Sequence, residues 1–424
     1  MGRTVRTRHT PNLPPVQKIE LPSVTPKWRW ALVILLLVFG IGILVHTLVS
    51  FLSAQAGWQE IEVNSTDDLS CASDFTLLYN LGASGIAAPA ESRALTTLYT
   101  QAATDAFKLF TGDIGYYDVH NVYYINRHPN EVIELDEALY RAFEQVVASG
   151  DRSIYLGPIY DTYNGLFTCQ DDLLTVDFDP VQNEALRATF ANFAAFASDA
   201  QSVDLRLLDG NKIELFVSSE YLAYAEAEDV ADFIDFYWMK NAFIADYLAD
   251  TLAAGGYTLG TLSSHDGFIR CLDDASGTEY ALNLYDRVDT TVYPAAVMRY
   301  SGARAICALR GYPLIDADMS RFYVFADGQV RTPYLDARDG LCRNATDDLV
   351  LTSRAMGCAQ LLLRSIPVFI ADAFDESAIG ALANEAIGAV YCRDRTVLCS
   401  DPSLTITDVL ASESVAYTVM YTGK

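Results

Sequence analysis

An uninterrupted apolar run near the amino terminus constrains this chain more than any other feature. Residues 31–52 (ALVILLLVFGIGILVHTLVSFL) carry no charge, and 22 residues at helical rise can cross a hydrocarbon core of roughly 30 Å. Six Lys and Arg residues precede the run against a single acid, Glu20, and this bias retains the amino end in the cytoplasm. The run therefore predicts one uncleaved membrane anchor, with about 370 residues outside the cytoplasm.

A cleaved signal peptide is the alternative, because Ala54-Gln55-Ala56 resembles a cleavage site. The apolar run is longer than a usual signal core, and a leader of about 30 residues precedes it, so we favour the anchor. The predicted organisation is a cytoplasmic basic leader (1–30), a transmembrane anchor (31–53), a stalk (54–73) and an extracytoplasmic domain (74–424). The predicted location is the cell membrane, crossed once.

The exported part is strongly acidic. The chain has 29 Lys and Arg against 55 Asp and Glu, and residues 31–424 keep 23 and 54 of them, a net charge of −31. Such a surface repels nucleic acid and anionic headgroups. We therefore expect no nucleic-acid partner, and the acidic coat is also what keeps an exported domain soluble.

Eight cysteines are present without a CxxC pair, which argues against thioredoxin-like redox sites and zinc ribbons. Disulfides persist outside the cytoplasm. The best local candidate is Cys392–Cys399, which would close the polar loop RDRTVL.

Helix and strand patterns interleave along residues 75–424 without a strict βαβ repeat, which predicts an α+β fold. Hairpins are expected around Asp209-Gly210 and Asp327-Gly328. The expected helices are 95–110, 135–148, 182–197, 236–254, 356–370 and 376–390. Further strands are expected in 75–88 and in the segments YALNLY, AAVMRY, AICALR and SVAYTVMY.

Several catalytic signatures are absent from the sequence: HExxH, GxSxG, the Walker loop and GxGxxG. Ser263-Ser264-His265-Asp266 contains the residue types of a catalytic triad. Consecutive side chains point apart, however, and cannot form its hydrogen-bond relay.

The most informative internal stretch is residues 235–270. A strand is expected to lead into a helix whose first turn carries Lys240 and Asn241, and a second strand to end at His265-Asp266. A helix start offers free N–H groups and a positive dipole end, which suit an anion. Lys240 and Arg270 add positive charge that is scarce in this chain. An ordinary amphipathic helix with an incidental lysine is the alternative.

The same stretch resembles the core signature of the FAD:protein FMN transferase (ApbE) family, D-x5-KGY-x2-D followed by a helix, a glycine and a strand that ends in GGD. Asp235 and Asp246 keep the family's separation, and Leu252 and Gly256 fall where its helix ends.

Other landmarks resemble the family in the same order over roughly residues 75–424. Leu81-Gly82-Ala83 resembles its opening MGT, Asn126 its early asparagine, and Gly157-Pro158 the segment before its central helices. Residues 336–340 (DARDG) resemble its later HIIDPxTG.

The departures from the family pattern concern its ligand-binding positions. Without a gap, Asn241 rather than Lys240 falls on the family lysine; His265-Asp266 replace paired glycines, and Thr332-Pro333 replace histidines. The family's DAxxT, which supplies magnesium ligands, aligns with residues 358–362 (CAQLL), where neither Cys358 nor Leu362 offers the oxygen that Mg²⁺ prefers.

The resemblance implies an α+β flavin-transferase-like domain. It implies FAD as cofactor, Mg²⁺ as doubtful with no metal ligand assigned, and a flavin nucleotide and an exported acceptor protein as partners. If active, the domain would transfer the FMN half of FAD to a Ser or Thr hydroxyl. The alternatives are a catalytically decayed flavin-binding or protein-interaction module on this fold, and an unrelated fold. No catalytic residue is singled out. The residues expected to bind the cofactor are Gly82, Lys240, Asn241, Asp246, His265, Asp266, Arg270, Asp336 and Gly340.

Overall fold

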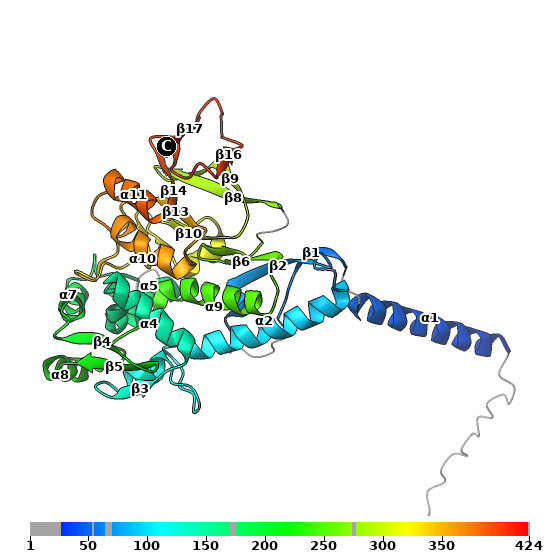
Figure 1. Cartoon of the computed structure of the whole chain (residues 1–424), viewed down its shortest axis with the longest axis horizontal. Helices are drawn as coiled ribbons and strands as arrows, with labels where there is room; N and C mark the ends of the chain where they lie inside the picture. The colour runs from blue at the N-terminus through cyan, green and yellow to red at the C-terminus, as the bar shows by residue number, and fades with distance from the viewer. Residues whose placement is uncertain (1–26, 53–54, 64–69, 170–174, 274–276, 423–424) are drawn as a thin grey trace, which may run out of the picture. The chain divides into compact units, whose positions relative to one another are not determined.

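The computed structural model describes residues 27–52, 55–63, 70–169, 175–273 and 277–422. These fall into two units, residues 1–54 and 55–424 (Figure 1). The first unit contains helix α1 (Lys27–Leu52), which covers most of the predicted anchor. Residues 1–26 of the predicted leader lie outside the described part of the chain. Among the described residues, no helix combines the length and the apolar character that a membrane crossing needs.

The second unit holds all the sheets of the described chain. Its helices are α2 (Ala88–Phe110), α3 (Val122–Asn126), α4 (Glu137–Ser149), α5 (Gly157–Thr168), α6 (Thr175–Phe178), α7 (Glu184–Ser198), α8 (Ser219–Ala227), α9 (Lys240–Ala254), α10 (Cys358–Phe369) and α11 (Glu376–Leu382). Its strands are β1 (Gly57–Glu60), β2 (Phe75–Leu81), β3 (Val132–Glu134), β4 (Val203–Leu208), β5 (Lys212–Val217), β6 (Gly260–Ser264), β7 (Phe268–Cys271), β8 (Glu279–Val288), β9 (Thr291–Ser301), β10 (Arg304–Arg310), β11 (Tyr323–Val324), β12 (Val330–Arg331), β13 (Asp348–Ser353), β14 (Gly388–Arg393), β15 (Thr396–Cys399), β16 (Thr405–Thr407) and β17 (Thr418–Tyr421).

A nine-stranded sheet of order β1-β2-β6-β7-β10-β13-β14-β15-β17 forms the centre of this unit. Every neighbouring pair in it is antiparallel except β15 and β17. Two smaller sheets have the orders β16-β9-β8 and β3-β5-β4, and β11 pairs with β12 alone. This architecture confirms the predicted α+β class.

The two faces of the large sheet are covered by different elements. Ile306, Val350 and Val390 share one apolar cluster with Met298 of β9, so the β16-β9-β8 sheet packs on their face. Side chains alternate along a strand, so Cys307 lies on the opposite face, where Ser365 of α10 contacts it. Helices α2, α9 and α10 pack together on that side. The core is therefore a helix layer, a sheet and a second, smaller sheet.

Most of the elements expected from the sequence are present, with shifted ends. The Asp209-Gly210 hairpin is confirmed, and both Gly210 and Asn211 have positive φ, as its tight turn requires. The helix expected at 376–390 was too long: α11 ends at Leu382, and Ala386 adopts a left-handed conformation before β14 begins. The cause is tertiary, since Ala389 and Val390 are buried between β13 and β15.

Two further expectations differ from the structure. Part of the predicted stalk belongs to the large sheet, because β1 pairs with β2. The predicted Cys392–Cys399 disulfide is wrong, since both thiols are free. Cys392 faces Val397 and Cys399 faces Val390, so the two cysteines are diagonal neighbours, roughly 7–8 Å apart. A disulfide needs Cα atoms within about 4.4–6.8 Å of each other.

Candidate functional site

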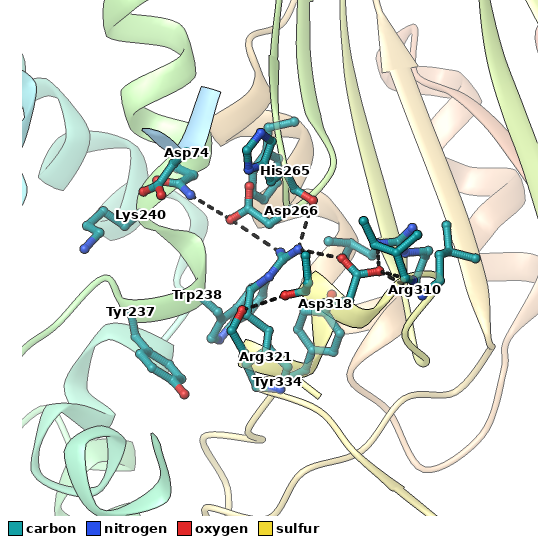
Figure 2. Close-up of a pocket in the computed structure, with 18 of the residues that line it drawn as sticks. Asp74, Tyr237, Trp238, Lys240, His265, Asp266, Arg310, Asp318, Arg321 and Tyr334 are labelled. Carbon is teal, nitrogen blue, oxygen red and sulfur yellow. Dashed lines mark hydrogen bonds and ion pairs between the residues drawn. The ribbon is translucent and has the colours of Figure 1, made fainter. Parts of the chain in front are cut away.

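A cavity of about 800 Å³ opens where the start of α9, the β6–β7 turn and the segment after β10 meet (Figure 2). This volume lies in the range of roughly 300–1,000 Å³ that small-molecule sites occupy. Its walls combine charged side chains with aromatic ones. The lining residues that concern its chemistry are Asp74, Tyr237, Trp238, Lys240, Asn241, His265, Asp266, Arg310, Asp318, Arg321 and Tyr334.

The start of α9 places Lys240 and Asn241 on the cavity wall. A 3₁₀ turn, Tyr237–Met239, runs directly into the helix in place of the expected strand. The Asp235 carboxylate accepts from the Tyr237 N–H at the start of this turn, and the Lys240 N–H bonds the Tyr237 carbonyl. Asn241 donates from Nδ2 to Asp266 Oδ2 at 3.0 Å. In the described part of the chain Lys240 has no ion-pair partner, and its charge acts on the nearby Asp235.

The β6–β7 turn supplies His265 and Asp266. Gly267 closes this turn with a φ of +103°, and a Cβ there would stand 2.1 Å from the Ala308 carbonyl oxygen. Only glycine therefore allows the turn to pack this close to β10. Burial raises the pKa of Asp266, although Arg321 and Asn241 act in the opposite direction.

Two arginines that the sequence analysis did not single out complete the polar wall. The Asp318 carboxylate accepts from the backbone N–H of Leu314 at 2.8 Å and pairs with Arg310 at 3.3 Å and Arg321 at 3.5 Å. Arg321 also donates to the His265 carbonyl at 2.9 Å and lies 4.0 Å from Asp266 Oδ2. Figure 2 shows both guanidinium groups converging on Asp318. Their only sequence signal was positive charge after a strand in an acidic chain.

Aromatic rings form the rest of the wall. Trp238 packs edge-on against Tyr334, with ring centroids 5.0 Å apart, and Tyr237 stacks on Tyr160 at 4.5 Å. Tyr237 has a φ of +43°, a strained conformation for a bulky residue that functional sites often retain. Planar ligands can stack on such rings.

The charge balance of the cavity differs from that of the whole chain. Three Lys or Arg and three Asp line it, whereas the chain has 29 against 55. Asn241 Oδ1, Asp266 Oδ1 and Trp238 Nε1 are buried without a hydrogen-bond partner in the described structure. Such groups are costly unless something satisfies them. The cavity therefore lacks the acidic excess of the chain and is suited to a polar ligand with a planar part.

Four of the nine residues expected to bind the cofactor line this cavity: Lys240, Asn241, His265 and Asp266. Asp246 and Arg270 form an ion pair instead, and Asp246 accepts the N–H groups of Cys358 and Ala359 at the start of α10.

The other three expected residues shape turns away from the cavity. Gly82, with a φ of +84°, donates its N–H to the buried Glu91 carboxylate at 2.6 Å. Asp336 is held by Arg338 and Arg343. Gly340 has a φ of +71° and its N–H bonds the Asp336 carbonyl at 2.8 Å.

The residues aligned with the family's magnesium motif do not fit a metal. Cys358 and Leu362 are completely buried, and the Cys358 thiol faces the carbonyls of Ile269 and Ile306. Burial raises the pKa of this thiol far above its usual range, so it stays protonated. The described residues contain no cluster of His, Cys, Asp or Glu able to hold a metal ion.

The fold is similar to that of two solved ApbE proteins. The ApbE protein from Thermotoga maritima has a TM-score of 0.53 at 12% sequence identity, over 84% of this chain and 97% of that one. Flavin transferase ApbE from Vibrio cholerae has a TM-score of 0.51 at 12% identity, over 79% and 93% of the two chains. No protein-family model and no curated protein matches the sequence. The resemblance inferred from ordered motifs is thus confirmed at the level of the fold.

Proposed function

We propose that this protein is a flavin-transferase-like protein that binds FAD in the cavity at the start of α9. It passes the FMN half to a Ser or Thr hydroxyl of an exported protein. One observation carries the proposal: in an ApbE-like fold, the paired side chains Asn241 and Asp266 keep unsatisfied buried oxygens beside the cations Lys240, Arg310 and Arg321.

Each part of the cavity suits one part of this ligand. The three cations offer positive charge to a diphosphate. The unpaired oxygens of Asn241 and Asp266 accept hydrogen bonds from ring N–H or ribityl hydroxyl groups after small side-chain rotations. Trp238 and Tyr334 present apolar ring surface for a planar group.

The transfer itself exchanges one phosphorus–oxygen bond for another. The acceptor hydroxyl oxygen bonds to the phosphorus on the FMN side, the anhydride bond to the adenylate phosphate breaks, and AMP leaves. The hydroxyl proton passes to water. The chain's contribution is to orient the diphosphate and to stabilise charge on the transferring phosphoryl oxygens through its cations.

A second candidate is a non-catalytic flavin-binding or protein-interaction module on the same fold. The closed, apolar setting of Cys358 and Leu362 favours it, because these positions provide no oxygen for Mg²⁺. The enzyme and the flavin-binding form of the second candidate place the flavin in the same cavity.

The site of action that we propose is outside the cytoplasm, at the membrane. The proposal rests on the uncharged run 31–52 and the basic residues before it. A tethered domain of this kind would meet acceptor proteins as they emerge on the same face of the membrane.

Two measurements on the purified domain separate the candidates. Quenching of flavin fluorescence on titration with FAD measures binding, and an in-gel flavin signal on a co-expressed exported protein with accessible Ser and Thr measures transfer. Binding with transfer supports the enzyme, and binding alone supports the second candidate. Absence of FAD binding contradicts the enzyme and the flavin-binding module, and leaves the protein-interaction module.

A further inference from the structure

A second cavity, of about 510 Å³, lies between β8 and the large sheet. One wall is the apolar face of that sheet, with Ile269, Ala308, Val350 and Val390. The other wall is β8 itself, which contributes every residue from 280 to 285. Side chains of a strand alternate between two faces, so a cavity that touches six successive residues runs along the strand's edge.

This edge of β8 is unpaired. In the order β16-β9-β8 the strand has β9 on one side only. In the described structure no backbone hydrogen bond joins residues 280–285 to anything but β9. Unpaired N–H and C=O groups along a strand are a template for another extended chain. Six residues span roughly 20 Å of such a template.

The groove leads into the flavin cavity. His265, Tyr285, Leu309 and Arg310 line both. At this junction β8 has a bulge between Leu284 and Tyr285, and bulges redirect side chains and end regular pairing. A strand added to β8 would therefore lose its register where the two cavities meet.

We propose that an extended segment of the acceptor protein binds as an added strand along residues 280–285 of β8. The inference rests on the proposed function, for which it supplies the acceptor's binding mode. Only a polypeptide offers backbone donors and acceptors at the spacing of a strand edge, and the apolar sheet face opposite receives every second side chain. The acceptor residue that lies opposite the β8 bulge then carries its hydroxyl toward Arg310 and the flavin diphosphate.

The test uses residues 55–424 together with the full chain, and a phage-displayed library of random twelve-residue peptides as the probe. Peptides enriched on the protein are resynthesised and their affinity is measured by fluorescence anisotropy, with and without backbone N-methylation at alternate residues. Ala281→Lys blocks the β8 edge with a long charged side chain. The matched control is Thr405→Lys, an equally exposed substitution on β16 at the opposite edge of the same small sheet.

We expect enriched peptides to lose at least tenfold in affinity on N-methylation and in Ala281→Lys, and to keep their affinity in Thr405→Lys. Deuterium uptake of β8 should fall when they bind. FAD affinity, measured separately, should stay within twofold in both variants. Absence of enriched peptides, or binding indifferent to N-methylation and to Ala281→Lys, overturns this inference and leaves the flavin proposal standing. Absence of FAD binding instead refutes the flavin proposal, whatever the peptides do.

Discussion

Asp246 and Cys358 lie 112 residues apart in the chain, and Asp246 Oδ1 accepts a hydrogen bond from the Cys358 backbone N–H at 2.8 Å. The second carboxylate oxygen accepts from Ala359 at 2.9 Å. One side chain of α9 thus satisfies two of the N–H groups that the start of α10 leaves free. Arg270 pairs with the same carboxylate. The motif residue Asp246 therefore joins two helices and a strand.

Loss of this carboxylate should destabilise the fold. We expect Asp246→Ala to lower the free energy of unfolding by about 3–5 kcal/mol, because the largely buried Arg270 loses its buried partner and keeps only the exposed Asp250, and two N–H groups of α10 lose their acceptor. The control is Asp250→Ala, since Asp250 pairs with Arg270 from a mostly exposed position and should change stability by less than about 1 kcal/mol. Urea denaturation measures both. Equal effects of the two substitutions would contradict the capping role.

Lys240 should contribute to flavin affinity. We expect Lys240→Ala to weaken FAD binding by roughly 1–2 kcal/mol through a lost charge-assisted contact. Lys212→Ala, at an exposed position beside the β4–β5 turn, is the charge-matched control and should leave affinity unchanged. Fluorescence titration at fixed ionic strength measures both. An equal, small loss in the two variants would show only a general effect of net charge.

Stability should depend on the ionisation of Asp235. Burial raises the pKa of this carboxyl to about 6, even though Lys240 acts to lower it. The folded state therefore holds a proton that the unfolded state releases near pH 4, so this group's contribution to stability falls as pH rises from about 4 to 6. Relative to Asp235→Asn, the wild type should lose up to about 3 kcal/mol across this interval. Parallel stability–pH curves for the two proteins would contradict the shift.

The predicted anchor calls for its own experiment. Protease added to intact cells should remove residues after the apolar run and leave the amino-terminal leader protected. Detection uses tags at both ends of the chain. Recovery of a chain that lacks residues 1–54 in the medium would favour the cleaved signal peptide.

Local patterns predicted most elements of this fold, because turn residues and helical periodicity act over a few neighbours. The α4 and α7 helices and the β4–β5 hairpin were recovered this way. The errors came where pairing with distant strands decides the local structure. The pattern of residues 388–390 predicts a helix, but in the fold these residues form the start of β14 between β13 and β15. The two cysteines of β14 and β15 are close in sequence, but strand register separates them.

The site shows the same division. Lys240, Asn241, His265 and Asp266 could be grouped because one continuous stretch carries them to the cavity. Arg310, Asp318 and Arg321 were missed because their convergence depends on how the chain folds back after β10. Asp336 and Gly82 matched motifs, yet motif order fixes sequence position only, and the fold uses both in turns.

Magnesium should have little influence on this protein. The positions aligned with the family's metal motif begin α10, where Cys358 is a buried, protonated thiol and Leu362 is packed in the core. Mg²⁺ needs oxygen ligands, and the cations Arg310 and Arg321 already face the cavity. We expect equal FAD affinity in millimolar Mg²⁺ and in EDTA, measured by titration with ionic strength held constant by NaCl.

Two substitutions of Cys358 test the same point. Cys358→Asp buries a carboxylate in an apolar setting, so it should lower the melting temperature by several degrees without creating a dependence on Mg²⁺. Cys358→Ala should be tolerated. A tenfold gain in wild-type affinity with Mg²⁺ would mean that other oxygens of the chain bind the ion, and would restore a metal-assisted transferase as the leading candidate.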